Sequence, residues 1–125
     1  MSHLLDVNVL LAAIWTNHPQ HAQANAWIRG KELTVCPLSE LGFVRISSNP
    51  KGINASMGDA RTALDNFLIK YQVAWIPDNL RALESKPDKS DQVTDHYLAD
   101  LADKHGVKLA TFDAGIKHPA VQLIT

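Results

Sequence analysis

Cysteine is almost absent from this sequence: Cys36 is the only one in 125 residues, so the chain cannot form an internal disulfide. A single cysteine fits a reducing compartment, where such a residue is usually a small buried apolar side chain. The chain also lacks an apolar run long enough to span a membrane, because Asp6 and Asn8 interrupt the run that continues to Ile14. Its first residues lack the basic lead of a signal peptide. We therefore expect a soluble, cytoplasmic protein with no membrane partner.

An excess of charge of one sign is also missing: the formal net charge is −1, and only 6% of the residues are aromatic. Near-neutrality argues against a broad basic face for nucleic acid, although acids gathered around bound cations would leave the remaining surface positive. The six histidines are scattered and only Cys36 could add a thiolate, so a structural zinc site is not expected. Trp15, Trp27 and Trp75 lie in apolar periodic segments, which favours core packing over stacking on RNA bases.

The length allows one compact domain, residues 1–125, and the sequence shows no internal repeat or linker. Short apolar segments indicate strands at residues 3–5, 33–36, 73–76, 107–110 and 121–124. Helices are expected at residues 7–15, 21–28, 38–46, 60–71 and 94–105, and a short one at 80–84. Strands that alternate with helices predict an α/β fold with a central, mainly parallel sheet covered on both faces.

Acidic residues follow several of the predicted strands. Asp6 comes directly after the first strand, Glu40 lies in the first turn of the helix after the second, and Asp113 follows the strand at 107–110. Asp95 opens the predicted helix before that strand. The carboxyl ends of parallel strands meet at one edge of a sheet, so these acids are expected to converge there.

Converging carboxylates favour a particular chemistry. Four of them packed together would repel one another, and a divalent cation relieves that repulsion. An all-oxygen site with open water positions suits Mg²⁺ or Mn²⁺. Such ions generate hydroxide and stabilise an in-line attack on phosphorus.

Local structure offers simpler explanations for two of these acids. Asp6 at a strand–helix junction is typical of a helix N-cap, although Asn8 two positions later adds a second polar group that needs a partner. Glu40 in a first turn is favoured by the helix dipole, by roughly 0.3–1 kcal/mol at an exposed site. What makes Glu40 a site candidate is its position just after a strand, at that strand's carboxyl end.

Other acids lie near Asp95. Asp100 and Asp103 are expected on the solvated outer face of the same helix. Asp91 is the stronger competitor, because Ser90 and Asp91 could cap that helix and place an acid near the same cleft.

Four segments, LLDVNVLLA, PLSELGFVR, TDHYLADLADKHG and LATFDAGI, follow one another along the chain in an order and spacing that resemble the PIN domain. Within that family they are similar to the VapC-type ribonuclease toxins of bacterial toxin–antitoxin pairs. The resemblance implies four metal-binding and catalytic acids, which are Asp6, Glu40, Asp95 and Asp113. It also implies that Asn8 and Thr111 support the site as polar neighbours. Arg45 matches an arginine of many relatives, and its role is left open between packing, orienting a carboxylate and touching substrate.

The resemblance implies a PIN-like three-layer α/β/α sandwich. It further implies an endoribonuclease that uses Mg²⁺ or Mn²⁺ and leaves a 5′-phosphate and a 3′-hydroxyl. The expected partners are an RNA substrate, a cognate antitoxin protein and a second copy of the chain in a homodimer.

Three other classes of protein share some of these features. Asp6-Val7-Asn8-Val9 is similar to the first motif of haloacid-dehalogenase-like phosphatases, but Asn8 stands where those enzymes need a second acid. A receiver-like phosphoacceptor module would start with adjacent acids and carry its phosphoacceptor on the third strand, whereas residues 73–76 end in Pro77-Asp78. A catalytically silent PIN-type binding module is the remaining alternative, and the intact acids argue against it.

Overall fold

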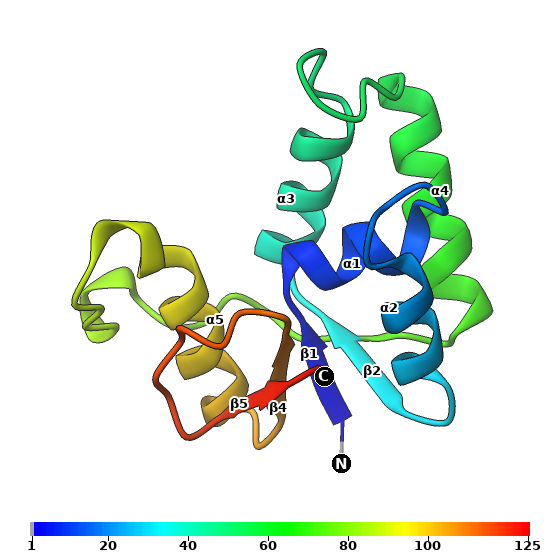
Figure 1. The fold of residues 1–125 in the computed structure, drawn as a ribbon. Coiled ribbons are helices and arrows are strands. Elements are labelled where there is room, and N and C mark those ends of the chain that lie inside the picture. The colour runs from blue at the N-terminus through cyan, green and yellow to red at the C-terminus, as the bar shows by residue number, and fades with distance from the viewer. Residues whose placement is uncertain (1) are drawn as a thin grey trace.

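A computed structural model describes residues 2–125 and shows a central sheet with helices on both faces (Figure 1). The strands are β1 (Ser2–Leu5), β2 (Glu32–Val35), β3 (Ala74–Trp75), β4 (Lys108–Thr111) and β5 (Val121–Leu123). They lie in the order β3-β2-β1-β4-β5, and every neighbouring pair is parallel. The sequence prediction of a mainly parallel sheet in a three-layer sandwich is therefore confirmed.

Helices connect the strands. They are α1 (Val7–Ile14), α2 (His21–Ile28), α3 (Pro37–Ser47), α4 (Met57–Lys70) and α5 (Val93–Lys104), with short 3-10 helices at Ala82–Glu84 and Ser90–Gln92. Pro37 begins α3, where the missing N–H of proline costs no hydrogen bond. The Ser56 hydroxyl caps α4 by accepting the Asp59 amide at 3.0 Å, so this helix begins earlier than its apolar spacing predicts.

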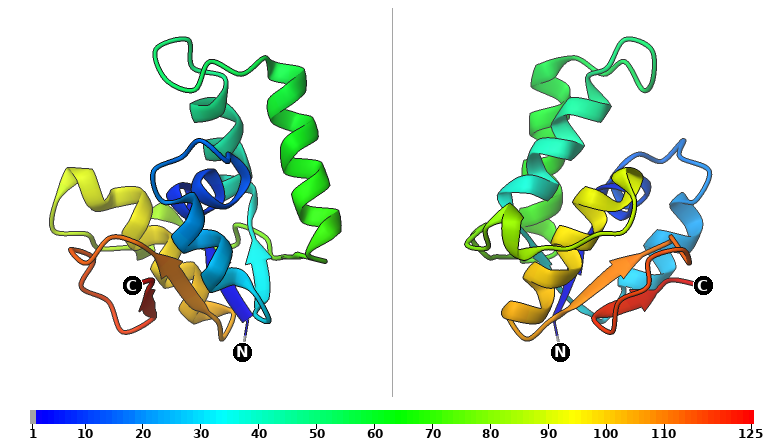
Figure 2. Two further views of the ribbon diagram at one scale, coloured as in Figure 1. Left: turned by 45° about the vertical axis from the view of Figure 1, so that its right-hand side comes forward. Right: turned by 90° about the vertical axis from the view of Figure 1, so that its left-hand side faces the viewer.

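Alternate residues of the central strands face the two helical layers. The register pairs Leu4 with Leu109 and Leu5 with Ala110. Leu4 and Leu109 pack with the buried face of α5, whereas Leu5 and Ala110 belong to the larger core formed with the other helices. Side chains along a strand point alternately to opposite faces, so one short apolar strand can serve both cores. In the right panel of Figure 2, α5 lies beside β4 and in front of β1.

α3 and α4 run side by side and extend beyond the sheet (Figures 1 and 2). Gly42 allows α3 to lie close to α1, because a Cβ there would meet Val7 Cγ2 at 2.6 Å. Phe43, the next residue, is fully buried and stacks on the ring of Trp15. This contact holds the first half of α3, which carries Glu40, against the core.

The structure corrects one expectation about the tryptophans. Trp15 and Trp27 are half-buried against the main core, but Trp75 is 57% exposed. Trp75 lies on β3, an edge strand of only two residues that pairs with β2 alone, so no strand lies along its outer edge to help cover the side chain. Cys36 is buried as expected, with Sγ 3.3 Å from the Ser39 hydroxyl. Over residues 2–125, no helix has the length and apolar character needed to cross a membrane.

Candidate active site

The candidate site lies where the order of the strands reverses. After β1 the chain adds β2 and β3 on one side, then returns to add β4 and β5 on the other. In parallel sheets of this kind, ligands usually bind in the crevice beyond the carboxyl ends of the strands, at the point where the strand order reverses. Asp6 follows β1, and its amide donates to the carbonyl of Ala110 in β4 at 3.3 Å. Asp6 and the end of β4 are therefore neighbours at this edge.

Asp6 combines a structural task with an unusual ionisation. It caps α1, because its Oδ1 accepts the Val9 amide at 2.9 Å. The side chain is nevertheless buried, with 3% of the residue exposed. Burial raises the pKa of Asp6 to about 6, and repulsion from Asp95 adds to the rise, while hydrogen bonds from Thr111 and nearby amides oppose it. Capping α1 would need only a side-chain oxygen, so it does not explain why a buried carboxylate stands near a second acid, Asp95.

Thr111 connects two of the predicted site residues. It is the last residue of β4 and is fully buried. Its side chain forms a hydrogen bond that favours the ionised form of Asp6, and its Oγ1 accepts the Asp113 amide at 3.1 Å. The hydroxyl thus donates to one acid and holds the backbone of the other. The carboxylate of Asp113 in turn accepts the Gly115 amide at 2.8 Å.

Asp95 lies in the first turn of α5, facing the same edge. The structure corrects the start of this helix to Val93, which leaves Asp95 as its third residue, and Asp91 falls in the 3-10 helix just before it. Burial raises the pKa of Asp95, and repulsion from Asp113 and then Asp91 raises it further. Asp95 is therefore electrostatically linked to Asp6, Asp113 and Asp91, which makes Asp91 a neighbour of the site.

The other predicted residues lie on α1 and α3. Glu40 is in the first turn of α3 and lines a groove of about 850 Å³ between α3 and α4. Asn8 is exposed in the first turn of α1, and Arg45 is exposed in the last turn of α3. Within residues 2–125, no three His, Cys, Asp or Glu side chains stand close enough together to hold one metal ion. The acids share an edge of the sheet, and their side chains do not close into a cluster.

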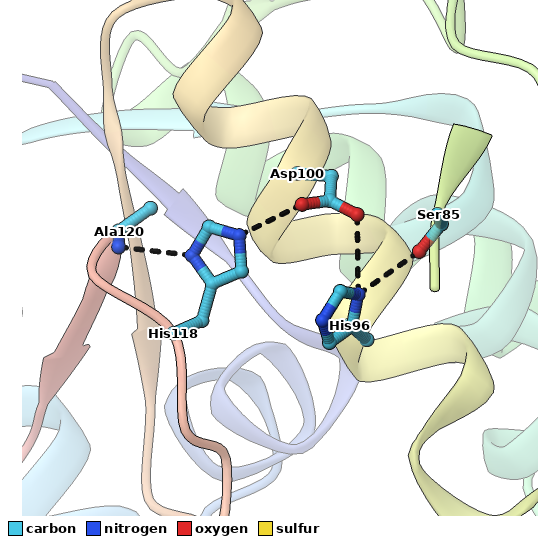
Figure 3. A network of polar contacts seen from close by, with 5 residues as sticks. All are labelled: Ser85, His96, Asp100, His118 and Ala120. Atoms are coloured by element: carbon cyan, nitrogen blue, oxygen red, sulfur yellow. Dashed lines mark hydrogen bonds and ion pairs between the residues drawn. The ribbon is translucent and has the colours of Figure 1, made fainter. Parts of the chain in front are cut away.

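A polar network beside the site was missed by the sequence prediction (Figure 3). Asp100 was expected on the solvated face of α5, and that expectation is wrong. Its two carboxylate oxygens contact His118 Nε2 at 2.8 Å and His96 Nδ1 at 3.1 Å, and His96 Nδ1 also lies 3.0 Å from the Ser85 hydroxyl. Asp103, the other acid assigned to that face, is exposed as expected.

The backbone fixes the proton position in this network. The Ala120 amide donates to His118 Nδ1 at 3.0 Å, so the proton of the neutral ring is on Nε2 and is donated to Asp100. Burial would raise the pKa of Asp100, but hydrogen bonds from His118 and Ser85, with a smaller electrostatic contribution from His96 and His118, outweigh it and lower the pKa. The network ties α5, which carries Asp95, to the loop after β4.

A second contact joins the same two segments. Gln92, at the start of α5, donates its side-chain amide to the Gly115 carbonyl at 3.1 Å. The loop that carries Asp113 is thus bonded to the α5 segment at Gln92 and again at Asp100, about two helical turns further along. These bonds hold Asp95 and Asp113 on the same side of the sheet edge.

The chemistry of these donors fits a hard divalent cation. The groups that face the edge are carboxylates, with no thiolate or imidazole linked electrostatically to Asp6 or Asp95 among the described residues. Two of the acids have raised pKa values because burial and mutual repulsion disfavour their charged forms. A divalent cation between them would remove that repulsion.

The fold and the site together define an α/β protein with acids gathered at the carboxyl edge of a parallel sheet. A model of the PIN domain family matches residues 3–122, nearly the whole chain, and the protein belongs to that family. This membership confirms the resemblance drawn from the four sequence segments.

Relatives and a solved structure agree with this assignment. Ribonuclease VapC38 of Mycobacterium tuberculosis is 37% identical, over 90% of this chain and 86% of the relative. Ribonuclease VapC39 of the same species is 34% identical, over 96% of this chain and 94% of the relative. The fold is similar to a crystal structure of VapBC2 from Rickettsia felis bound to a DNA fragment from their promoter, with a TM-score of 0.65, 14% identity, and 98% and 97% of the two chains covered.

Proposed function

We propose that this protein is a metal-dependent endoribonuclease and acts as the toxin of a toxin–antitoxin pair. The observation that carries the proposal is the buried Asp6, whose pKa is raised and whose neighbours at the sheet edge are further acids. Relatives that are named ribonucleases, at 34–37% identity over nearly their full length, support the same activity.

The proposed metal site uses Asp6, Glu40, Asp95 and Asp113, and the ion is Mg²⁺ or Mn²⁺. When bound, such an ion supplies an activated water and stabilises negative charge on the phosphate. Thr111 orients Asp6 and the Asp113 backbone through the bonds described above. Asn8 is proposed as a polar neighbour of the site, and Asp91 and Arg45 as accessory groups.

The products test the type of reaction. Metal-free ribonucleases use the 2′-hydroxyl of the RNA as nucleophile, which needs an acid–base pair and leaves a 2′,3′-cyclic phosphate. Hydrolysis by water leaves a 5′-phosphate and a free 3′-hydroxyl. We expect the second outcome, with activity that is lost in EDTA and restored by Mg²⁺ or Mn²⁺.

Cleavage should persist when the scissile 2′-hydroxyl is replaced by hydrogen, provided that the RNA still binds. A cyclic phosphate, or full cleavage in EDTA, would contradict the proposed metal site.

Amide variants test the individual acids. Asp6→Asn, Glu40→Gln, Asp95→Asn and Asp113→Asn should each abolish cleavage while leaving the circular dichroism spectrum of the folded protein unchanged. Asp103→Asn, at an exposed position of α5, is the matched control and should remain active. Activity in Asp95→Asn together with its loss in Asp91→Asn would show that Asp91 is the acid that α5 contributes.

The proposed partners are a cognate antitoxin and a second copy of this chain. The structurally similar Rickettsia felis protein is a VapBC2 assembly on promoter DNA, which supports an antitoxin partner for this chain. An isologous contact is the commonest route to a homodimer. Co-expression with the product of an adjacent small reading frame should suppress cleavage, and light scattering should give the mass of a dimer. If light scattering gives the mass of a monomer at the concentration of the cleavage assay, the proposed homodimer is refuted. If co-expression leaves cleavage unchanged, the co-expressed product is not the antitoxin.

The same assays address the alternatives. A PIN domain that serves only as a binding module would bind RNA without cleaving it in any divalent ion. A haloacid-dehalogenase-like phosphatase would release phosphate from small esters, and membership of the PIN domain family gives this alternative no support.

A further inference from the structure

A second cavity lies beside the acids and has no role in the proposed hydrolysis. Its volume is about 340 Å³, at the lower end of the range for small-molecule sites. Leu38, two residues before Glu40, forms part of one wall, and Thr94, directly before Asp95, forms part of another. The cavity therefore lies between the first turns of α3 and α5, the two turns that also carry Glu40 and Asp95.

The walls of this cavity are mainly apolar and include a fixed aromatic ring. Leu80 and Pro87, from the segment after β3, lie opposite Tyr97 of α5. The Tyr97 hydroxyl donates to the Leu80 carbonyl at 2.6 Å, which holds the ring in place. Such a cavity takes a flat apolar group with little loss of side-chain entropy in the protein.

One charged group gives the cavity its polarity. Asp78 lines it, and none of the described lining residues is Lys or Arg. Asp78 and Tyr97 both line the cavity, and burial, followed by the nearby charge of Asp78, raises the pKa of Tyr97. A phosphate would be repelled here. A neutral group that presents N–H donors would be bound, since hydrogen bonds to a charged acceptor are stronger than neutral ones.

We propose that this cavity binds a guanine base next to the scissile phosphate, with its N1–H and N2–H donors on Asp78 and its face in contact with Tyr97. The inference rests on the proposed ribonuclease function. Proteins that read RNA sequence do so mostly on splayed bases, through their Watson–Crick edges and aromatic contacts. Guanine presents two adjacent donors on that edge. Adenine, cytosine and uracil each place an acceptor beside their single donor group, and that acceptor would face the carboxylate.

Binding can be measured without cleavage. The probe is a fluorescein-labelled seven-nucleotide RNA with one guanine among uracils, and the matched RNAs carry inosine, adenine or uracil at the same position. Inosine lacks only the 2-amino group, so it removes one donor and keeps the other. Fluorescence anisotropy in EDTA should give binding of the guanine RNA that is about three- to tenfold tighter than that of the inosine RNA.

Variants assign the preference to one carboxylate. In Asp78→Asn the guanine-to-inosine ratio should fall to below about twofold, because the charged acceptor is gone. Asp88→Asn is the matched control, since Asp88 is an exposed acid of the same segment that does not line the cavity. It should keep the wild-type ratio.

The outcomes separate this inference from the proposed function. Equal binding of the four RNAs, no measurable binding, or an unchanged ratio in Asp78→Asn would overturn the guanine site. The same RNAs are then incubated with Mn²⁺. Cleavage without a guanine preference would leave the ribonuclease function standing and refute the cavity as a base site. A guanine preference that depends on Asp78, without cleavage in any divalent ion, would support the cavity and refute the nuclease.

Discussion

Asp6→Asn provides a quantitative test of the buried carboxylate. The pKa of Asp6 is raised from 3.8 to about 6, chiefly by burial. One pKa unit corresponds to about 1.4 kcal/mol, so ionising Asp6 in the folded protein costs roughly 3 kcal/mol. Asparagine is as good an N-cap as aspartate, and it can keep the bond from the Val9 amide while removing the charge.

The sign of the pH dependence follows from these two pKa values. In the unfolded chain Asp6 loses its proton near pH 3.8, and in the folded protein near pH 6. Between these values the folded state binds more protons, so the free energy of unfolding falls as the pH rises through this window and stays lowered above it. Asp6→Asn removes this contribution. The variant should match the wild type near pH 4 and exceed its stability above pH 6, by up to about 3 kcal/mol.

Thermal unfolding in EDTA, followed by circular dichroism from pH 4 to pH 8, measures this difference. A gain of 3 kcal/mol corresponds to a rise of roughly 10 °C in Tm for a domain of this size. Adding Mg²⁺ should raise the Tm of the wild type and leave that of Asp6→Asn unchanged. Asp103→Asn is the control for removing an exposed acid, and its Tm should follow the wild type across the pH range. An Asp6→Asn protein that is less stable at pH 7.5, or that keeps the wild-type pH slope, would refute the reasoning.

Three further predictions concern the scaffold. Gly42→Ala should destabilise the protein by about 1–3 kcal/mol in urea unfolding, because the added methyl meets Val7 at 2.6 Å. Gly58→Ala, in α4 with open space around the new methyl, should be neutral or stabilise by up to about 1 kcal/mol, and equal effects of the two changes would contradict this difference. Asp100→Asn should cost about 1–2 kcal/mol and speed hydrogen exchange at residues 112–120, and unchanged exchange there would show that the network does not hold the loop.

Sequence analysis predicts the fold best where a short apolar strand is followed at once by polar residues. β1 and β4 are short apolar segments that end at a polar residue, so the positions of Asp6 and Asp113 could be read directly. Parallel pairing then followed from the alternation of strands and helices. Thr111 was assigned by family resemblance alone, and its bonds to both acids depend on the register between β1 and β4.

The errors arose where the deciding contact is distant in sequence. Trp75 lies in an apolar segment, but periodicity does not tell an edge strand from a central one. Asp100 occupies a polar position of an amphipathic helix, and only the path of the loop after β4 brings His118 to it. Helical spacing therefore places Asp100 on the polar face of α5, but it does not predict that His118 from the loop after β4 covers that face.

The separation of the site along the chain has a consequence for synthesis of the protein. Asp6 is translated long before Asp95, Thr111 and Asp113, because α2, β2, α3, α4 and β3 lie between them in the sequence. These residues come together only when β4 pairs with β1. In a nascent chain whose β4 is still in the exit tunnel, the proposed site therefore lacks Asp113, and Asp6 lacks the bond from Thr111. The proposed nuclease site is therefore complete only after β4 has left the ribosome and joined the sheet.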